Sequence, residues 1–281
     1  MRRILMSVVT VAITLSVYSI AAAQTTVHVA ENQGPITGGP LMKGEVTLIA
    51  PGGIRAAVEK LIAGFEKKTG YTVNATFGSG GGTKQQVVHG DVFDVPIVQP
   101  PYPDVIASGN VVESSATPLA SVAVGVCVKQ GAPKPDISTA EAVKKMLLSA
   151  KSIAIPDAAL GAAAGGTINK MLKDMGIDDQ VEPKLKRPRG SGPGGSGGGN
   201  AVAAMVANGE VEIGMTFYSE INDPGVYKVG MLPKEVSPRT ALVGFVSAHA
   251  KNPQGAKALL KYISSPEAMA VYKEVGMEPG K

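Results

Sequence analysis

The fold is decided by residues 45–80, EVTLIAPGGIRAAVEKLIAGFEKKTGYTVNATFGSG. The run from Glu45 to Ala50 is typical of a buried strand, and Pro51-Gly52-Gly53 turns the chain. Apolar residues then recur with a helical period until Thr69-Gly70, and residues 71–77 form a second strand. A strand, a helix and a strand in this order predict a parallel sheet that is covered by helices on both faces.

The same alternation continues to the end of the chain. We expect further strands at residues 94–98, 122–128, 152–155, 212–217 and 241–247. We expect further helices at residues 83–89, 138–149, 167–175, 201–208, 253–263 and 266–275. Asp91 and Asp94 fall between a helix and a strand, where we expect a solvated turn. Residues 186–199 are rich in glycine and predict a loop.

The first residues have the parts of an export signal. Arg2 and Arg3 form the positive start, residues 4–20 are an apolar run, and Ala21-Ala22-Ala23 is a cleavage motif of small residues. Polar residues follow directly, which argues against a transmembrane anchor. We therefore expect cleavage after Ala23 and a mature protein in the periplasm, which begins with an N-terminal tail at residues 24–43.

Composition argues against several classes of function. Removing Arg2 and Arg3 lowers the formal net charge from +4 to +2, which gives no reason to expect nucleic acid or a membrane surface as a partner. The single cysteine, Cys127, cannot form an internal disulfide and lies in an apolar run, so we expect it to be buried. The three histidines have no metal-ligand spacing. We therefore expect no metal and no cofactor.

Three glycine-rich turns precede expected helices: Pro51-Gly52-Gly53, residues 78–83 and residues 190–200. A helix N-terminus exposes free backbone N–H groups, and glycine lets an anion approach them. Ser79 and Thr83 add hydroxyl donors, and Lys84 adds a charge. Because ligands of open α/β sheets bind beyond the carboxyl ends of strands, the turns predict a site for a small anion. The alternative is that the glycines merely make the turns tight.

The sequence shows no catalytic set. Residues 78–84 do not follow the order of a phosphate-binding loop, and neither Ser79 nor Ser191 lies in a nucleophile elbow with a histidine to serve it. His89 is expected on a helix surface, and Asp178-Asp179 in a loop between helices. We therefore expect a binding protein and not an enzyme.

Several segments carry a resemblance to a known family: residues 65–73 (FEKKTGYTV), 77–80 (FGSG), 94–97 (DVPI) and 206–214 (VANGEVEIG), with a C-terminal run over residues 250–279. They resemble the extracellular solute-binding proteins of ABC transporters, most of all the branch that contains the molybdate-binding protein. The resemblance covers residues 45–281. It implies an α/β, two-lobed type II periplasmic-binding fold, with an interlobe cleft and a two-strand hinge near residues 122–128 and 241–247. Lobe 1 would comprise residues 44–123 and 236–281, and lobe 2 residues 124–235.

The resemblance also bears on which residues bind the ligand. With the glycine turns, it points to Gly52, Gly53, Gly78, Ser79 and Gly80 in lobe 1 and to Asp157, Phe217 and Tyr218 in lobe 2. Molybdate binders have a serine in the turn after the first strand, where this chain has Pro51-Gly52-Gly53, and their tyrosine falls on Phe217. These two departures argue against molybdate or tungstate as the ligand. Arg187 and Arg189 either reach a carboxylate or phosphate ligand or lie in a solvated loop.

These features predict a monomeric substrate-binding protein that captures a small oxyanion or organic acid and presents it to the membrane permease of an ABC transporter. Two alternatives stay open: a periplasmic enzyme on the same α/β scaffold, and a non-transport sensor or binding lobe. A nucleophile–base pair in the cleft would favour the first, and a filled or collapsed cleft the second.

Overall fold

A computed structural model describes residues 44–190 and 198–280. The described residues belong to one compact unit. The expected export signal (residues 1–23) and N-terminal tail (residues 24–43) lie outside the described residues. Within the described ranges, no helix is both long enough and apolar enough to cross a membrane.

Six strands form the first sheet. They are β1 (Gly44–Pro51), β2 (Tyr71–Gly78), β3 (Val95–Val98), β4 (Thr117–Val122), β10 (Thr240–Gly244) and β11 (Glu278–Pro279). Their order is β11-β4-β10-β3-β1-β2. β1 pairs in parallel with β2 and β3, but β10 is antiparallel to β3 and β4, and β11 is antiparallel to β4. The prediction of a parallel sheet is therefore correct for β1, β2 and β3, but the complete six-stranded sheet is mixed. It is mixed because the chain returns from the second sheet at the end where β3 and β4 finish, so β10 runs in the opposite direction.

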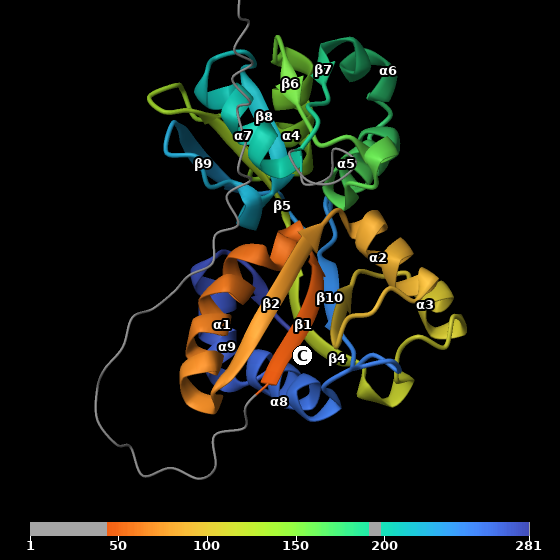
Figure 1. The fold of residues 1–281 in the computed structure, drawn as a ribbon. Coiled ribbons are helices and arrows are strands. Elements are labelled where there is room, and N and C mark those ends of the chain that lie inside the picture. Colours follow the sequence, from red (N-terminus) through yellow and green to blue (C-terminus); the bar gives the residue numbers. More distant parts are fainter. Residues whose placement is uncertain (1–43, 191–197, 281) are drawn as a thin grey trace, which may run out of the picture. The chain divides into compact units, whose positions relative to one another are not determined.

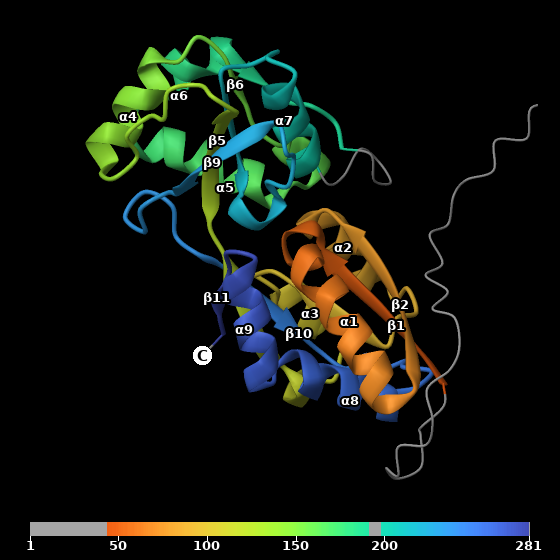
Figure 2. The same ribbon diagram turned by 90° about the vertical axis from the view of Figure 1, so that its left-hand side faces the viewer.

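Helices cover both faces of the first sheet, as predicted. They are α1 (Arg55–Thr69), α2 (Gly80–His89), α3 (Pro103–Ala107), α8 (Pro253–Ile263) and α9 (Pro266–Glu274). α1, α8 and α9 lie together on one face, and α2 and α3 lie on the other (Figures 1 and 2). Val46 and Leu48 of β1 pack in one apolar cluster with α1, and Ile49 packs in another with α2 and α3. β1 is thus buried on both faces, which explains its continuous apolar run.

The second sheet has five strands. They are β5 (Val124–Lys129), β6 (Ile153–Ala154), β7 (Leu185–Lys186), β8 (Ile213–Phe217) and β9 (Val226–Met231). Their order is β7-β6-β8-β5-β9. β6 is parallel to β7 and β8, whereas β5 is antiparallel to β8 and β9. This sheet is also mixed.

The helices of the second sheet are α4 (Ala140–Ser149), α5 (Ala163–Asp174), α6 (Asp178–Val181) and α7 (Gly198–Ala207). Apolar residues of α4, α5 and α6 share a cluster with Val124 and Val126 of β5, and those of α7 share another with Cys127. Cys127 is fully buried, as predicted, and burial raises the pKa of its thiol to about 12. Its side chain is therefore a packing residue and not a reactive thiol.

In the part of the chain that the structure describes, 3₁₀ turns connect these elements. They are η1 (Gly52–Ile54), η2 (Glu113–Ser115), η3 (Ala158–Leu160), η4 (Glu182–Lys184) and η6 (Tyr218–Glu220).

Several predicted boundaries were wrong. The strand predicted at 152–155 is the two-residue β6, and the strand predicted at 241–247 is β10, which ends at Gly244. The helices predicted to begin at residues 83, 167 and 201 begin earlier, α2 at Gly80, α5 at Ala163 and α7 at Gly198. All three helices have glycines in the first turn, which lower the intrinsic helix preference that the sequence prediction relied on. Tertiary packing overrides that preference: a Cβ on Gly165 would lie 2.1 Å from the carbonyl oxygen of Pro156.

The chain crosses between the two sheets twice. The first crossing is at Ala123, so the predicted strand 122–128 is in fact the end of β4 and β5. The second crossing is residues 232–239, between β9 and β10. The hinge predicted at 241–247 is therefore displaced, because β10 hydrogen-bonds to β3 and β4 within the first sheet.

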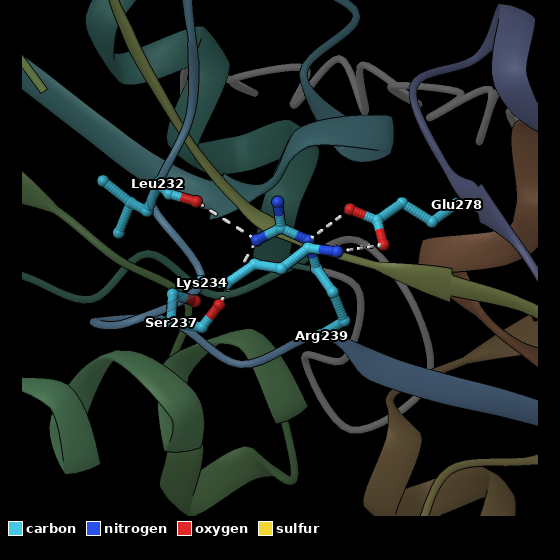
Figure 3. A network of polar contacts seen from close by, with 5 residues as sticks. All are labelled: Leu232, Lys234, Ser237, Arg239 and Glu278. Carbon is cyan, nitrogen blue, oxygen red and sulfur yellow. Dashed lines mark hydrogen bonds and ion pairs between the residues drawn. The ribbon is translucent and has the colours of Figure 1, made fainter. Parts of the chain in front are cut away.

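Arg239 holds the second crossing in place (Figure 3). Its guanidinium donates to the carbonyl oxygens of Leu232 and Ser237 at 3.1 and 3.3 Å and to the Glu278 carboxylate at 2.8 Å. Lys234 pairs with the other Glu278 oxygen at 3.1 Å. The network attaches the crossing segment to β11 at the edge of the first sheet.

Asp94 has a structural role that the sequence did not reveal. It is 1% exposed and accepts hydrogen bonds from the backbone N–H and hydroxyl of Thr47, at 2.8 and 2.9 Å, and from the N–H of Asn252 at 2.8 Å. The expectation of a solvated turn is correct for Asp91, which is exposed, and wrong for Asp94. Its carboxylate joins β1 to the start of α8.

Candidate functional site

The turns that follow parallel strands of both sheets meet at one small cavity. The turns after β1, β2 and β3 come from the first sheet, and those after β6 and β8 from the second. The cavity volume is about 20 Å³, counted as the space open to the centre of a water-sized sphere. Its lining residues are Pro51, Gly52, Gly53, Gly78, Ser79, Gly80, Gln99, Pro156, Ala162, Ala163, Ala164, Gly198, Gly199, Phe217 and Glu220.

Four helices begin at this cavity. Its lining includes the turn before α1, the first residues of α2 and α5, and Gly198-Gly199 of α7. The first N–H groups of a helix have no acceptor within the helix, and each N-terminus is equivalent to about half a positive charge. Neither Pro51 before η1 nor Ala162 before α5 supplies a side-chain cap. The cavity therefore has a positive potential that comes from the main chain.

Two glycines of the lining lie tightly against polar side chains of their own wall. A Cβ on Gly80 would lie 2.1 Å from Oε1 of Gln99, and a Cβ on Gly199 would lie 2.3 Å from Oε2 of Glu220. Real Cβ atoms do not approach other atoms so closely. Both glycines thus bring a polar side chain against a helix N-terminus.

Ser79 is the N-cap of α2. Its Oγ accepts a hydrogen bond from the N–H of Gly82 at 3.0 Å, and the residue is 6% exposed. A hydroxyl that accepts in this way still has its hydrogen to donate. Ser79 can therefore cap the helix and donate to a ligand at the same time.

Gln99 is a polar residue of the wall that the sequence prediction missed. It directly follows β3, is 3% exposed, and neither its Nε2 nor its Oε1 has a hydrogen-bond partner in the described structure. The hydroxyl of Thr83, 1% exposed, is also without such a partner. Buried polar groups are nearly always hydrogen-bonded, so a set of unpartnered atoms beside a cavity indicates a ligand site.

Glu220 is the one titratable side chain among the described residues that line the cavity. The Thr216 hydroxyl donates to its Oε2 at 2.6 Å. Burial raises the pKa of the Glu220 carboxyl, against a smaller lowering by the hydrogen bonds from Thr216 and Phe217. The wall therefore contains a carboxyl group that retains its proton more readily than an exposed one.

Beside the cavity, two hydrogen bonds join turns of the first sheet to turns of the second. The Ser219 hydroxyl donates to the carbonyl oxygen of Gly53 at 2.7 Å in a buried position. The N–H of Gly81 donates to the carbonyl oxygen of Gly161 at 3.0 Å. The turns that form the two walls are thus in direct contact.

Most of the expected ligand-binding residues lie at this cavity. Gly52, Gly53, Gly78, Ser79, Gly80 and Phe217 are among its lining residues, and Asp157 and Tyr218 are not. The Asp157 carboxylate accepts from the N–H of Ala159 at 2.9 Å and so caps η3. β8 ends at Phe217, and Tyr218 turns into η6 with its ring against Lys228.

The cations near the glycine turns have protein partners. Both guanidinium nitrogens of the Arg187 fork donate to the Glu182 carboxylate at 2.7 Å. Lys84 donates to the carbonyl oxygen of Pro101, and Arg189 is exposed. Residues 191–197 of the predicted loop lie outside the described residues. None of these three cations is among the cavity lining.

A second, larger cavity of about 670 Å³ lies where η2 meets α8. Its walls carry serines and the lysines Lys257 and Lys261, and none of the unpartnered buried atoms described above belongs to it. In the described ranges, no cluster of His, Cys, Asp and Glu could hold a metal ion. The smaller cavity is the better candidate for a specific site.

Known proteins are similar to this chain over most of its length. The model of a family described as bacterial extracellular solute-binding proteins matches residues 46–278. An aconitate isomerase from Pseudomonas sp. is 29% identical over 242 residues, which cover 83% of this chain and 87% of that protein. The molybdate-binding protein ModA from Rhodobacter capsulatus is 25% identical over 241 residues, which cover 84% of this chain and 89% of that protein.

A solved structure shows the same fold. The periplasmic molybdate-binding protein of Azotobacter vinelandii superposes with a TM-score of 0.67, at 18% identity, over 83% of this chain and 98% of that one. The type II periplasmic-binding fold predicted from the sequence is therefore confirmed. At this identity the likeness concerns the fold and not the ligand.

Proposed function

This chain belongs to the family of bacterial extracellular solute-binding proteins, and from that premise we propose that it captures a small anionic solute, an oxyanion or organic acid, and delivers it to the membrane permease of an ABC transporter. The observation that carries the proposal is the cavity where four helices begin and Gln99 is buried with its amide unpartnered. Main-chain N–H groups, the Ser79 hydroxyl and the Gln99 amide would together hold the anion.

The small volume of the cavity implies that the walls separate before binding. About 10–15 Å³ measured in the same way holds a single water. An oxyanion or organic acid has several non-hydrogen atoms and needs more space than the present cavity gives. Ligand entry would therefore break the Ser219–Gly53 contact, and closure on the ligand would restore it.

Thermal shift and calorimetry test the capture of an anion. Purified protein is titrated with sulfate, phosphate, molybdate and a series of di- and tricarboxylates. A ligand at a hundred times its Kd stabilises the folded state by about 2.7 kcal/mol. Ser79→Ala removes a hydrogen bond worth about 1 kcal/mol and should weaken binding of the best ligand about fivefold. No stabilisation by any anion of the panel would refute the proposal.

A second function, isomerisation of an unsaturated acid, is favoured by Glu220 and by the relative named aconitate isomerase. Such a reaction needs a group that removes a proton from one carbon and returns it to another, and a carboxyl with a raised pKa is suited to that exchange near neutral pH. Glu220 is the one titratable group in the described lining that could perform it.

Proton NMR tests this second function directly. The protein is incubated with cis-aconitate, and conversion to the trans isomer is followed against a buffer control. The Glu220→Gln variant should retain no conversion above that control. If the wild type binds the acid without converting it, isomerisation is excluded and capture alone remains.

We also propose the cellular setting that the sequence predicted: export with cleavage after Ala23, action as a monomer in the periplasm, and no nucleic-acid partner. The proposed lobes, residues 44–123 with 236–281 and residues 124–235, are supported by the two crossings between the sheets. Mass spectrometry of the exported protein would give its first residue, and limited proteolysis would test the lobe boundaries.

A further inference from the structure

The position of Glu220 sets a condition on any anion in the cavity. Its carboxyl is held by the Thr216 hydroxyl at 2.6 Å. A Cβ on Gly52 would lie 3.1 Å from its Oε1, and one on Gly199 would lie 2.3 Å from its Oε2. The carboxyl is therefore packed against the N-termini of two helices, η1 and α7, in the same wall that would receive the ligand.

Among the residues that the structure describes, no cation pairs with this carboxyl. Among the ion pairs of the described residues, none includes Glu220. On the neighbouring elements, Arg55 at the start of α1 pairs with Glu59, and Lys228 of β9 lies over the ring of Tyr218. Cys127 of β5 is a buried thiol that does not ionise near neutral pH, and the described side chains of α7 are uncharged.

An anion and an ionised Glu220 would repel each other in so small a space. When two acidic groups share one site, one of them holds a proton, because the site cannot stabilise both negative charges. Four helix N-termini, each equivalent to about half a positive charge, offset about two negative charges, which a dianion such as sulfate already supplies. Of the two acidic groups, the anion and Glu220, one must therefore carry a proton.

We propose that the cavity binds its anion together with one proton, which is shared between the ligand and Glu220. This inference rests on the proposed capture of an anion. An anion without a proton of its own binds to protonated Glu220, which donates a hydrogen bond to it. An anion that carries a proton, such as hydrogen phosphate, uses its O–H group to donate a hydrogen bond to ionised Glu220. The proton comes from solvent in the first case and from the ligand in the second.

Calorimetry in buffers of different ionisation enthalpy measures the proton directly. Sulfate and oxalate stay fully ionised from mildly acidic to mildly alkaline pH, so their binding to the wild type should take up one proton from solvent once Glu220 ionises in the free protein. Their affinity should then fall by about tenfold for each further pH unit. Phosphate should bind as the monoprotonated form with a smaller uptake.

Two variants show whether Glu220, and not another carboxylate, takes up the proton. Glu220→Gln keeps the shape and a hydrogen-bond donor, and its affinity for sulfate or oxalate should not change with pH and should involve no proton uptake. Glu235→Gln changes an exposed carboxylate outside the cavity and should behave as the wild type. Binding by the wild type without proton uptake, or an unchanged pH slope in Glu220→Gln, overturns this inference and leaves anion capture standing. Failure of the wild type and Glu235→Gln to bind any anion overturns both.

Discussion

Replacing Gln99 with methionine should change stability and ligand binding in opposite directions. Gln99 is 3% exposed, and both polar atoms of its amide lack a hydrogen-bond partner in the described structure. Methionine has a similar volume and no oxygen or nitrogen in its side chain. The variant therefore removes an uncompensated polar group from the ligand-free protein and a proposed donor from the complex.

The two effects have comparable magnitudes. A buried polar group without a partner destabilises the fold by about 1–3 kcal/mol, and a volume-conserving exchange costs less than about 1.5 kcal/mol. We expect Gln99→Met to raise the free energy of unfolding of the ligand-free protein by about 1 kcal/mol, or the melting temperature by about 2–4 °C. A hydrogen bond to a charged group contributes about 1.5–3 kcal/mol, so the affinity should fall at least about tenfold.

Urea denaturation without ligand and calorimetry with the best-binding anion measure these quantities. Gln85→Met, on the exposed face of α2, is the matched control and should change neither. A destabilised Gln99→Met variant would show that the amide has partners and is a structural residue. Unchanged affinity would remove Gln99 from the site, whatever its stability.

Three further predictions concern single contacts, two beside the cavity and one at the second crossing. Ser219→Ala removes the 2.7 Å bond to the carbonyl of Gly53; because this bond is present before ligand entry and is restored on closure, the variant should lower the free energy of unfolding in urea by about 1 kcal/mol and leave the affinity measured by calorimetry nearly unchanged. Glu220 has a raised pKa in the folded state. Its contribution to the free energy of unfolding is therefore complete below about pH 4.3 and is lost as pH rises through the folded pKa. In Glu220→Gln, denaturation curves measured at alkaline pH should no longer show this loss of stability. The pKa of Glu278 is lowered by Arg239, so its contribution is present above about pH 4.3 and is lost as pH falls. Because this carboxylate is 37% exposed, Glu278→Gln should cost less than about 1 kcal/mol and only flatten the acid limb of the stability profile.

The local elements of this fold could be predicted because their signals are local. The apolar run of β1, the helical period of α1 and the glycine at its end lie next to one another in the chain. The direction of β10 could not be predicted in this way. It depends on the crossing at residues 232–239, which sets the edge where the chain re-enters the first sheet.

The expected binding residues that line the candidate site lie at strand ends or in the turns that follow them, whereas Gln99 and Glu220 were missed because their neighbours come from distant segments. Gln99 follows β3 as Gly52 follows β1 and Ser79 follows β2, so the rule for the carboxyl ends of parallel strands applied to it as well. Its significance lies in having no partner, which only the packing of α2 against β3 reveals. Glu220 comes three residues after β8, and no pattern in that segment places it against Gly199.

The composition of the cavity wall favours a protonation-dependent choice of ligand over simple attraction of charge. Helix N-termini offer a positive potential without a mobile cation, so they stabilise one anion and lose little to screening by salt in a buried site. A lysine or arginine in the wall would neutralise Glu220 and let any anion of suitable size bind. With Glu220 unpaired, the number of protons carried by the ligand decides whether the two acidic groups attract or repel. An anion that binds equally well to the wild type and to Glu220→Gln at every pH would contradict this reasoning, even if it occupies the cavity.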